Sequence, residues 1–151
     1  MKAIILIAIF TPLVVFSLQI SKFVKHINVE LLSASTLLLG YLHGPIIATV
    51  FCFLAGFYGS FKISFIRFLM IVRIVITALI GFFMTFFKDN LDFNTYFIIG
   101  IVVMNIVAFF VYLVIDPDPI QNYTHRISHL LWNLTVVRLV YIVIYNLVTI
   151  I

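Results

Sequence analysis

The chain has 151 residues, of which 65% are hydrophobic and only 9% are charged, and its mean hydropathy is +1.30. Soluble domains contain about 45–50% apolar and about 25% charged residues, so the composition excludes a soluble domain and indicates a polytopic membrane protein. The net charge is +4, and the charged residues are scattered along the chain. This scatter excludes a nucleic-acid-binding protein and favours contact with the headgroups of the lipid bilayer.

Hydropathy predicts an all-α bundle of about six transmembrane helices in a single integral membrane domain, residues 1–151, because each span needs about 20 residues. The predicted spans cover residues 3–20, 27–41, 45–61, 64–87, 93–115 and 127–148. The first is expected to be a retained helix rather than a cleaved signal, since another apolar segment follows it. The five acidic residues support these boundaries because all lie in or near predicted loops: Glu30, Asp89, Asp92, Asp116 and Asp118.

Residues 30–60 predict a tight hairpin of two helices that bends at His43, Gly44 and Pro45. Small residues recur in steps of three and four on both arms, so each set shares one helix face, and small faces let helices approach closely in lipid. The first arm carries Ser33, Thr36, Gly40 and Gly44, and the second carries Ala48, Cys52, Gly56 and Ser60. The expected helix-packing residues are Gly40, Gly44, Pro45, Ala48, Cys52, Gly56 and Ser60.

Arg73 and Arg138 lie within predicted spans, where a charge facing lipid costs at least about 2.5–3.5 kcal/mol. Both are therefore expected to face the bundle interior, a wet cavity or a partner. Asn105 and Asn133 add amides inside the last two spans. At 100° per residue, one side of the last helix gathers Ser128, Thr135, Arg138, Tyr141, Tyr145 and Thr149. Two interpretations stay open: these groups hydrogen-bond to one another and fix the helix register, or they bind an anion, a ligand or a protein.

The sequence predicts a protein that is not an enzyme and holds no metal or cofactor. No carboxylate lies deep inside a span to act as a general acid or base, and motifs for a serine nucleophile or a phosphate loop are absent. His125 and His129 have metal-ligand spacing, but no carboxylate ligand accompanies them, so an interfacial polar turn is the preferred interpretation. Cys52 is the single cysteine and is interpreted as a small packing residue.

Several short motifs resemble the bacterial rod-shape protein family MreD. They are Leu18-Gln19 at the end of the first helix, NVELLSASTLLLGYLHGP, FCFLAGFYGS, and Asn133 in the last helix. The chain departs from the family pattern at Ser60, where an aspartate is usual, and at Asn28-Val29-Glu30, where Pro-Asp or Pro-Asn is common. The resemblance implies a non-catalytic, multi-pass scaffold of the inner (cytoplasmic) membrane in cell-wall elongation and cell shape. The implied partners are MreC, MreB and peptidoglycan-synthesis enzymes.

The hairpin also resembles the S components of energy-coupling-factor vitamin transporters, which join their second and third helices by a Gly-Pro bend, as here at Gly44-Pro45. This resemblance implies a substrate-binding subunit for transport of a vitamin or other small solute, partnered by a coupling subunit and ATPases. Its ligand-site candidates are Arg73, Asn105, Arg138, Tyr141 and Tyr145. A polar cavity lined by Arg138 and Tyr145 would favour this alternative, whereas a closed, dry bundle around Arg138 would argue against it.

The orientation in the membrane stays open. The termini and the loops on their side carry Lys2 and Lys88, and the opposite loops carry Lys22, Lys25, Lys62, Arg67 and Arg126. The positive-inside rule therefore predicts termini outside the cell, whereas both resemblances imply termini inside. If the hairpin at residues 30–60 crosses the membrane only once, the charge counts on the two sides become nearly equal.

Overall fold

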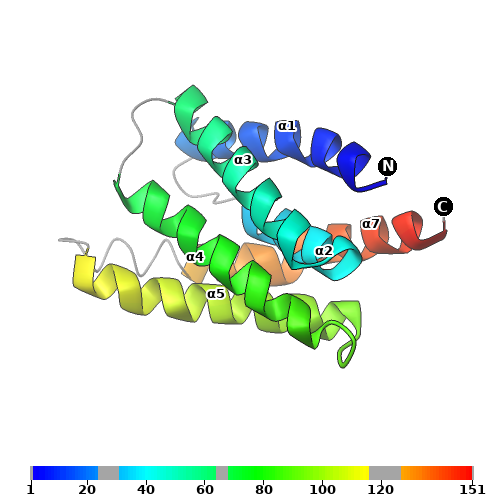
Figure 1. The fold of residues 1–151 in the computed structure, drawn as a ribbon. Helices are drawn as coiled ribbons and strands as arrows, with labels where there is room; N and C mark the ends of the chain where they lie inside the picture. The colour runs from blue at the N-terminus through cyan, green and yellow to red at the C-terminus, as the bar shows by residue number, and fades with distance from the viewer. Residues whose placement is uncertain (1, 24–30, 64–67, 116–126, 151) are drawn as a thin grey trace.

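The computed structural model describes residues 2–23, 31–63, 68–115 and 127–150. In these ranges the chain forms helices and no strand, which confirms the predicted all-α bundle (Figure 1). The helices are α1 (Lys2–Phe23), α2 (Leu31–His43), α3 (Pro45–Ile63), α4 (Phe68–Met84) with its 3-10 continuation η1 (Thr85–Phe87), and α5 (Phe93–Ile115). A C-terminal helix over Ile127–Ile150 contains the π-helical segment η2 (Asn133–Val137) and ends as α7 (Arg138–Ile150).

Four of the six described helices are long and apolar enough to cross a membrane: Lys2–Ile20, Phe68–Phe87, Phe93–Ile115 and Ile127–Ile150. The chain is therefore a membrane protein. The two hairpin helices are shorter, and the 13 residues of α2 extend only about 20 Å, less than the roughly 30 Å of a bilayer's hydrocarbon core. The predicted starts of the second and fourth spans, at residues 27–30 and 64–67, lie outside the described residues.

Helix α2 is the centre of the bundle. It packs against α1, α3, α4, α5 and the C-terminal helix, and residues 32–40 are all buried. The spacing of the small residues predicts one packing face on this arm, whereas the structure buries every face. Three polar side chains, Ser33, Ser35 and Thr36, are thus enclosed by protein, where each needs a hydrogen-bond partner.

The small residues of the hairpin permit close contacts with several helices. A Cβ atom added at Gly40 would lie 2.8 Å from Thr85 Cγ2 and 3.4 Å from Ala48 Cβ. Further along α3, the face of small residues packs against α4: a Cβ atom at Gly56 would lie 2.8 Å from Ile74 Cγ1. Cys52 Sγ also donates to the Ile74 carbonyl at 3.6 Å. The two arms therefore touch each other near the bend, and α3 then uses its small face to pack on α4.

The bend itself is a single residue between two helices. Gly44 has a φ of +89°, a left-handed conformation that residues with a Cβ adopt at a cost. Its N–H donates to the Gly40 carbonyl at 2.9 Å and ends α2, and Pro45 begins α3, where its missing N–H leaves no unpaired donor. Both chain termini and the α2–α3 and α4–α5 turns lie at one end of the bundle (Figure 1).

Candidate functional site

The first group of predicted polar residues surrounds a small space inside the bundle. We call it the inner polar cluster, and its members are Ser33, Arg73, Thr77, Asn105, His129 and Asn133. The first five of these side chains line a cavity of only about 10 Å³, together with three apolar side chains. That volume is about the minimum that holds one water molecule. The half-buried Arg73 therefore borders a nearly filled polar space rather than an open site.

His129 joins the two predicted amides. Its Nδ1 lies 3.1 Å from Asn105 Oδ1 on α5, and its Nε2 lies 3.2 Å from Asn133 Nδ2 on the same helix. An amide oxygen accepts and an amide nitrogen donates, so a neutral imidazole with its proton on Nδ1 satisfies both contacts. Each amide also donates at 2.8 Å to a carbonyl four residues earlier, that of Ile101 or His129. The contact between His129 and Asn105 links α5 to the C-terminal helix.

The π-helical segment η2 keeps this network facing inward. The buried residues of the C-terminal helix follow one another in steps of four: His129, Asn133, Val137 and Tyr141. In an α-helix each such step rotates the side chain by about 40°, so the stripe would turn away from the core. The wider i→i+5 turn over residues 133–137 offsets that drift.

The same segment separates Thr135 from the predicted polar side of the last helix. Thr135 and Thr149, expected on the side of Arg138 and Tyr141, are exposed. The Thr135 hydroxyl donates to the Leu131 carbonyl at 2.7 Å, so its own helix satisfies it. The projection at 100° per residue assumes a regular α-helix, which the π-helical turn interrupts at residues 133–137, so it does not hold for Thr135. Thr149 follows this turn and lies near the end of the regular helix α7.

The second group of predicted residues lies toward the C-terminal end of the chain. Arg138 is half-buried, and its Nε donates to Asn94 Oδ1 at 2.7 Å. The hydroxyl groups of Tyr141 and Ser35 lie 2.6 Å apart in the core. Tyr145 stacks on Phe93 with ring centroids 4.4 Å apart. Each of the three predicted residues therefore contacts α5 or α2.

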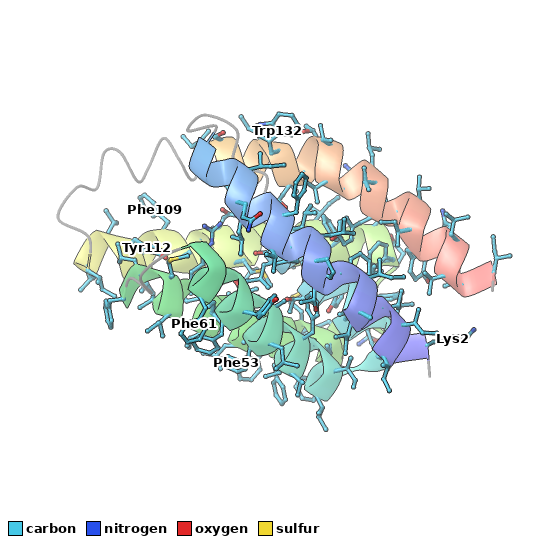
Figure 2. The ribbon with its side chains drawn as sticks, turned by 90° about the horizontal axis from the view of Figure 1, so that it is seen from above. Lys2, Phe53, Phe61, Phe109, Tyr112 and Trp132 are labelled. Carbon is cyan, nitrogen blue, oxygen red and sulfur yellow. The ribbon has the colours of Figure 1, made fainter. Side chains whose placement is uncertain are left out.

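Aromatic rings extend this second group into a cluster that joins α1, α2, α5 and α7. Tyr41 makes edge contacts with Phe93, Tyr96 and Tyr145 at 5.0–5.5 Å. Tyr141 contacts both Phe10 and Phe97, at 5.7 and 6.0 Å. Such pairs contribute about 0.5–1.5 kcal/mol each beyond the area they bury, so the cluster holds these four helices together. Figure 2 shows how side chains fill the space between the helices.

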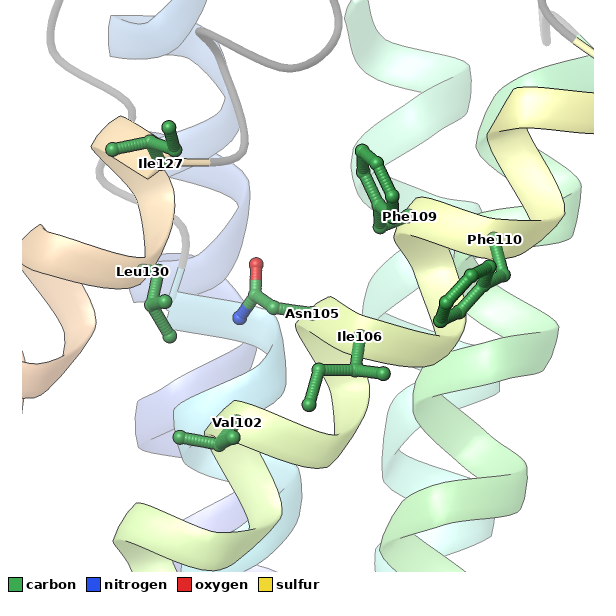
Figure 3. A pocket seen from close by; sticks show the side chains of 7 residues that line it. All are labelled: Val102, Asn105, Ile106, Phe109, Phe110, Ile127 and Leu130. Carbon is green, nitrogen blue, oxygen red and sulfur yellow. The ribbon is translucent and has the colours of Figure 1, made fainter.

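An open groove that sequence analysis did not anticipate runs between α5 and the C-terminal helix. Its volume is about 480 Å³, and it is lined by Val102, Asn105, Ile106, Phe109, Phe110, Ile127 and Leu130 (Figure 3). Asn105 is the single polar side chain among these seven, and it belongs to the inner polar cluster as well. The groove is therefore apolar apart from one amide already engaged with His129 and the Ile101 carbonyl.

The six polar candidates thus divide into Arg73, Asn105 and Asn133 in one place and Arg138, Tyr141 and Tyr145 in another. Two members of the inner polar cluster were missed: Thr77, and His129, which was considered only as half of a metal pair. The other half of that pair, His125, lies outside the described residues. Comparison of the chain with models of protein families, with curated proteins and with solved structures finds no match.

Proposed function

We propose that the protein is a non-catalytic scaffold of the cell-wall elongation machinery in the inner membrane, as its resemblance to the MreD family implies. The observation that supports this most is the filled polar interior. Ligand pockets measure about 300–1,000 Å³. The space beside Arg73, Asn105 and His129 measures about 10 Å³, which leaves no room for a solute.

In this proposal the bundle acts by positioning its partners. The inner polar cluster and the aromatic cluster fix the packing of α2, α5 and the C-terminal helix. Exposed apolar side chains on α1, α4 and the C-terminal helix, such as Phe16, Leu79 and Leu139, are then available within the membrane. MreC, MreB and wall-synthesis enzymes are the partners that the resemblance implies.

One observation favours the transporter alternative, namely the groove of about 480 Å³, which lies within the size range of ligand pockets. A vitamin-like solute, however, needs several placed polar groups, and the lining offers only the engaged amide of Asn105. Neither Arg138 nor Tyr145 lines the groove or the small cavity. The scaffold is therefore the better-supported function.

Depletion of the protein in the cell that encodes it separates the two functions. Rounding of rod-shaped cells is expected for a shape scaffold. Unchanged shape with lost uptake of a vitamin would reject the scaffold and support the transporter.

Complementation with variants tests whether the bundle itself is needed. Gly40→Leu is expected to fail to restore cell shape because even a Cβ atom there would lie 2.8 Å from Thr85 Cγ2. Leu79→Ala is the matched control, since Leu79 is exposed on α4, and it is expected to complement.

A further inference from the structure

The groove between α5 and the C-terminal helix has the position of a site that opens sideways into the bilayer. Ile106 and Phe110 on one wall and Ile127 on the other are 50%, 62% and 41% exposed. Both walls belong to helices that are long and apolar enough to span a membrane. A hydrocarbon chain can therefore reach this volume of about 480 Å³ directly from the bilayer.

The length of the groove matches one leaflet. Asn105 lies near the middle of α5 (Phe93–Ile115), and the groove extends along this helix from Val102 to Phe110. The eight steps from residue 102 to residue 110, at a rise of 1.5 Å each, cover about 12 Å, close to the half-thickness of a hydrocarbon core of about 30 Å. The opposite wall begins at Ile127, the first described residue of the C-terminal helix. The groove thus runs from the bilayer midplane toward one membrane surface.

A partner helix is a poor fit for this groove. Helices that pack in lipid approach through small residues, and apart from Asn105 the lining consists of valine, isoleucine, leucine and phenylalanine. The six glycines of the chain are used elsewhere. Gly44 forms the bend. At the other five, an added Cβ atom would meet another side chain of this chain within 3 Å: Gly40, Gly56, Gly59, Gly81 and Gly100. A flexible chain can follow bulky walls that a rigid helix cannot approach.

We propose that the groove is a binding site for one hydrocarbon chain of a membrane lipid. The apolar walls contact the methylene groups, and Asn105 is held by His129 and the Ile101 carbonyl, so no polar ligand atom is required. The inference requires only that α5 and the C-terminal helix span the membrane. It is therefore independent of the proposed scaffold function and would survive its failure.

Native mass spectrometry of the purified full-length protein, with dioleoylphosphatidylcholine as the probe, tests this site. The wild type is expected to retain one lipid per chain. Ile106→Trp fills the groove and is expected to weaken retention by about tenfold, because a chain loses contact over a few methylene groups. Val107→Trp is the matched control, since Val107 is exposed on the next position of α5 but does not line the groove, and it is expected to retain the lipid.

Two further arms keep the test decisive. Ile127→Trp narrows the groove from the other wall and is expected to act like Ile106→Trp, with helical content and thermal unfolding measured for each variant. Dihexanoylphosphatidylcholine, which has the same headgroup and short chains, is expected not to be retained. The proposal is overturned if the wild type retains no lipid, if both α5 variants retain it equally, or if the short-chain lipid binds equally well. A membrane protein that co-purifies and is lost in both groove variants would also overturn it.

Discussion

Among single residues, Gly44 carries the bend of the hairpin by its backbone alone. A Cβ atom at this position would meet nothing within 4 Å, so the requirement for glycine comes from the φ of +89°. Gly44→Ala is expected to lower the free energy of unfolding by about 1–2 kcal/mol, the cost of a left-handed conformation. Gly44→Asn is expected to cost less, because asparagine tolerates that region better. Denaturant titration in detergent micelles measures both, and equal losses would contradict the backbone explanation.

The imidazole of His129 couples two amides on different helices. Asn105→Leu and Asn133→Leu each remove one of its contacts, and hydrogen bonds inside membrane proteins contribute about 0.6 kcal/mol on average and up to about 1.7. Losses of that size are expected for each variant. The double variant is expected to lose less than the sum, since either change already disrupts the shared histidine.

A double-mutant cycle by chemical unfolding measures this coupling. Thr135→Val is the matched control on the same helix, because Thr135 is exposed and its hydroxyl bonds only its own helix. It is expected to change stability by less than about 0.5 kcal/mol. Additive losses at Asn105 and Asn133 would mean that His129 does not connect them.

The burial of Asn105 and Asn133 was predictable from the sequence, because an amide inside an apolar span must find a partner in the protein. The identity of that partner was not. His129 lies near the start of its helix and only three residues after Arg126, so the sequence favours a polar turn there. Only the packing of α5 against the C-terminal helix brings its ring to Asn105. The groove escaped prediction for the same reason, since its walls come from two helices.

At the scale of secondary-structure elements, Asp92 caps the start of α5. Its carboxylate accepts the Thr95 hydroxyl at 2.7 Å and the Thr95 N–H at 3.0 Å, and these bonds hold the pKa of Asp92 below its usual value. A lowered pKa in the folded state adds stability above the unfolded pKa of about 3.9, and this stability is lost as the pH falls through the folded value. The thermal midpoint is therefore expected to fall in acid.

Two variants test whether Asp92 causes this fall of the thermal midpoint in acid. Asp92→Asn is expected to remove the part that Asp92 contributes, because the amide does not titrate. Asp89→Asn, at an exposed position in the same turn, is expected to keep it. Thermal unfolding in micelles between pH 7 and pH 3 checks both, and identical profiles for Asp92→Asn and the wild type would rule out the cap as the source.

The ends of the helices were more predictable from the sequence than the surroundings of each helix. Pro45 begins α3 and residues 93–115 form α5, as the sequence predicts, because proline and polar turns mark helix ends in any solvent. The small faces of residues 30–60 predict close packing inside the bundle, but the burial of every face of α2 was not predictable. Lipid and protein interior are about equally apolar, so hydropathy cannot distinguish a helix surrounded by helices from one that faces lipid. The π turn of η2 left no signal that a regular helical projection could detect.

At the scale of the whole molecule, the short α2 makes the number of membrane crossings a testable quantity. The termini and the α4–α5 turn lie at one end of the bundle (Figure 1), so the number of crossings between Lys2 and Asn90 is even, and it is four if α2 and α3 each cross. If the hairpin of α2 and α3 crossed only once, the count would be three. Lys2 and Asn90 would then lie on opposite sides of the membrane.

Cysteine labelling decides between these counts, and the chain offers a clean background. Cys52, the single native cysteine, is fully buried, so a membrane-impermeant maleimide is expected not to label the wild type. Three variants are expected to be labelled under the same condition, either in intact cells or only after permeabilisation: Lys2→Cys, Asn90→Cys and Thr149→Cys. Phe61→Cys, exposed near the far end of α3, is the matched control and is expected to be protected when the other three positions are labelled, and labelled when they are protected.

Opposite labelling of positions 2 and 90 would mean a single crossing by the hairpin. Joint labelling in intact cells would place the termini outside, as the charge distribution predicts, and joint protection would place them inside, as the family resemblances imply.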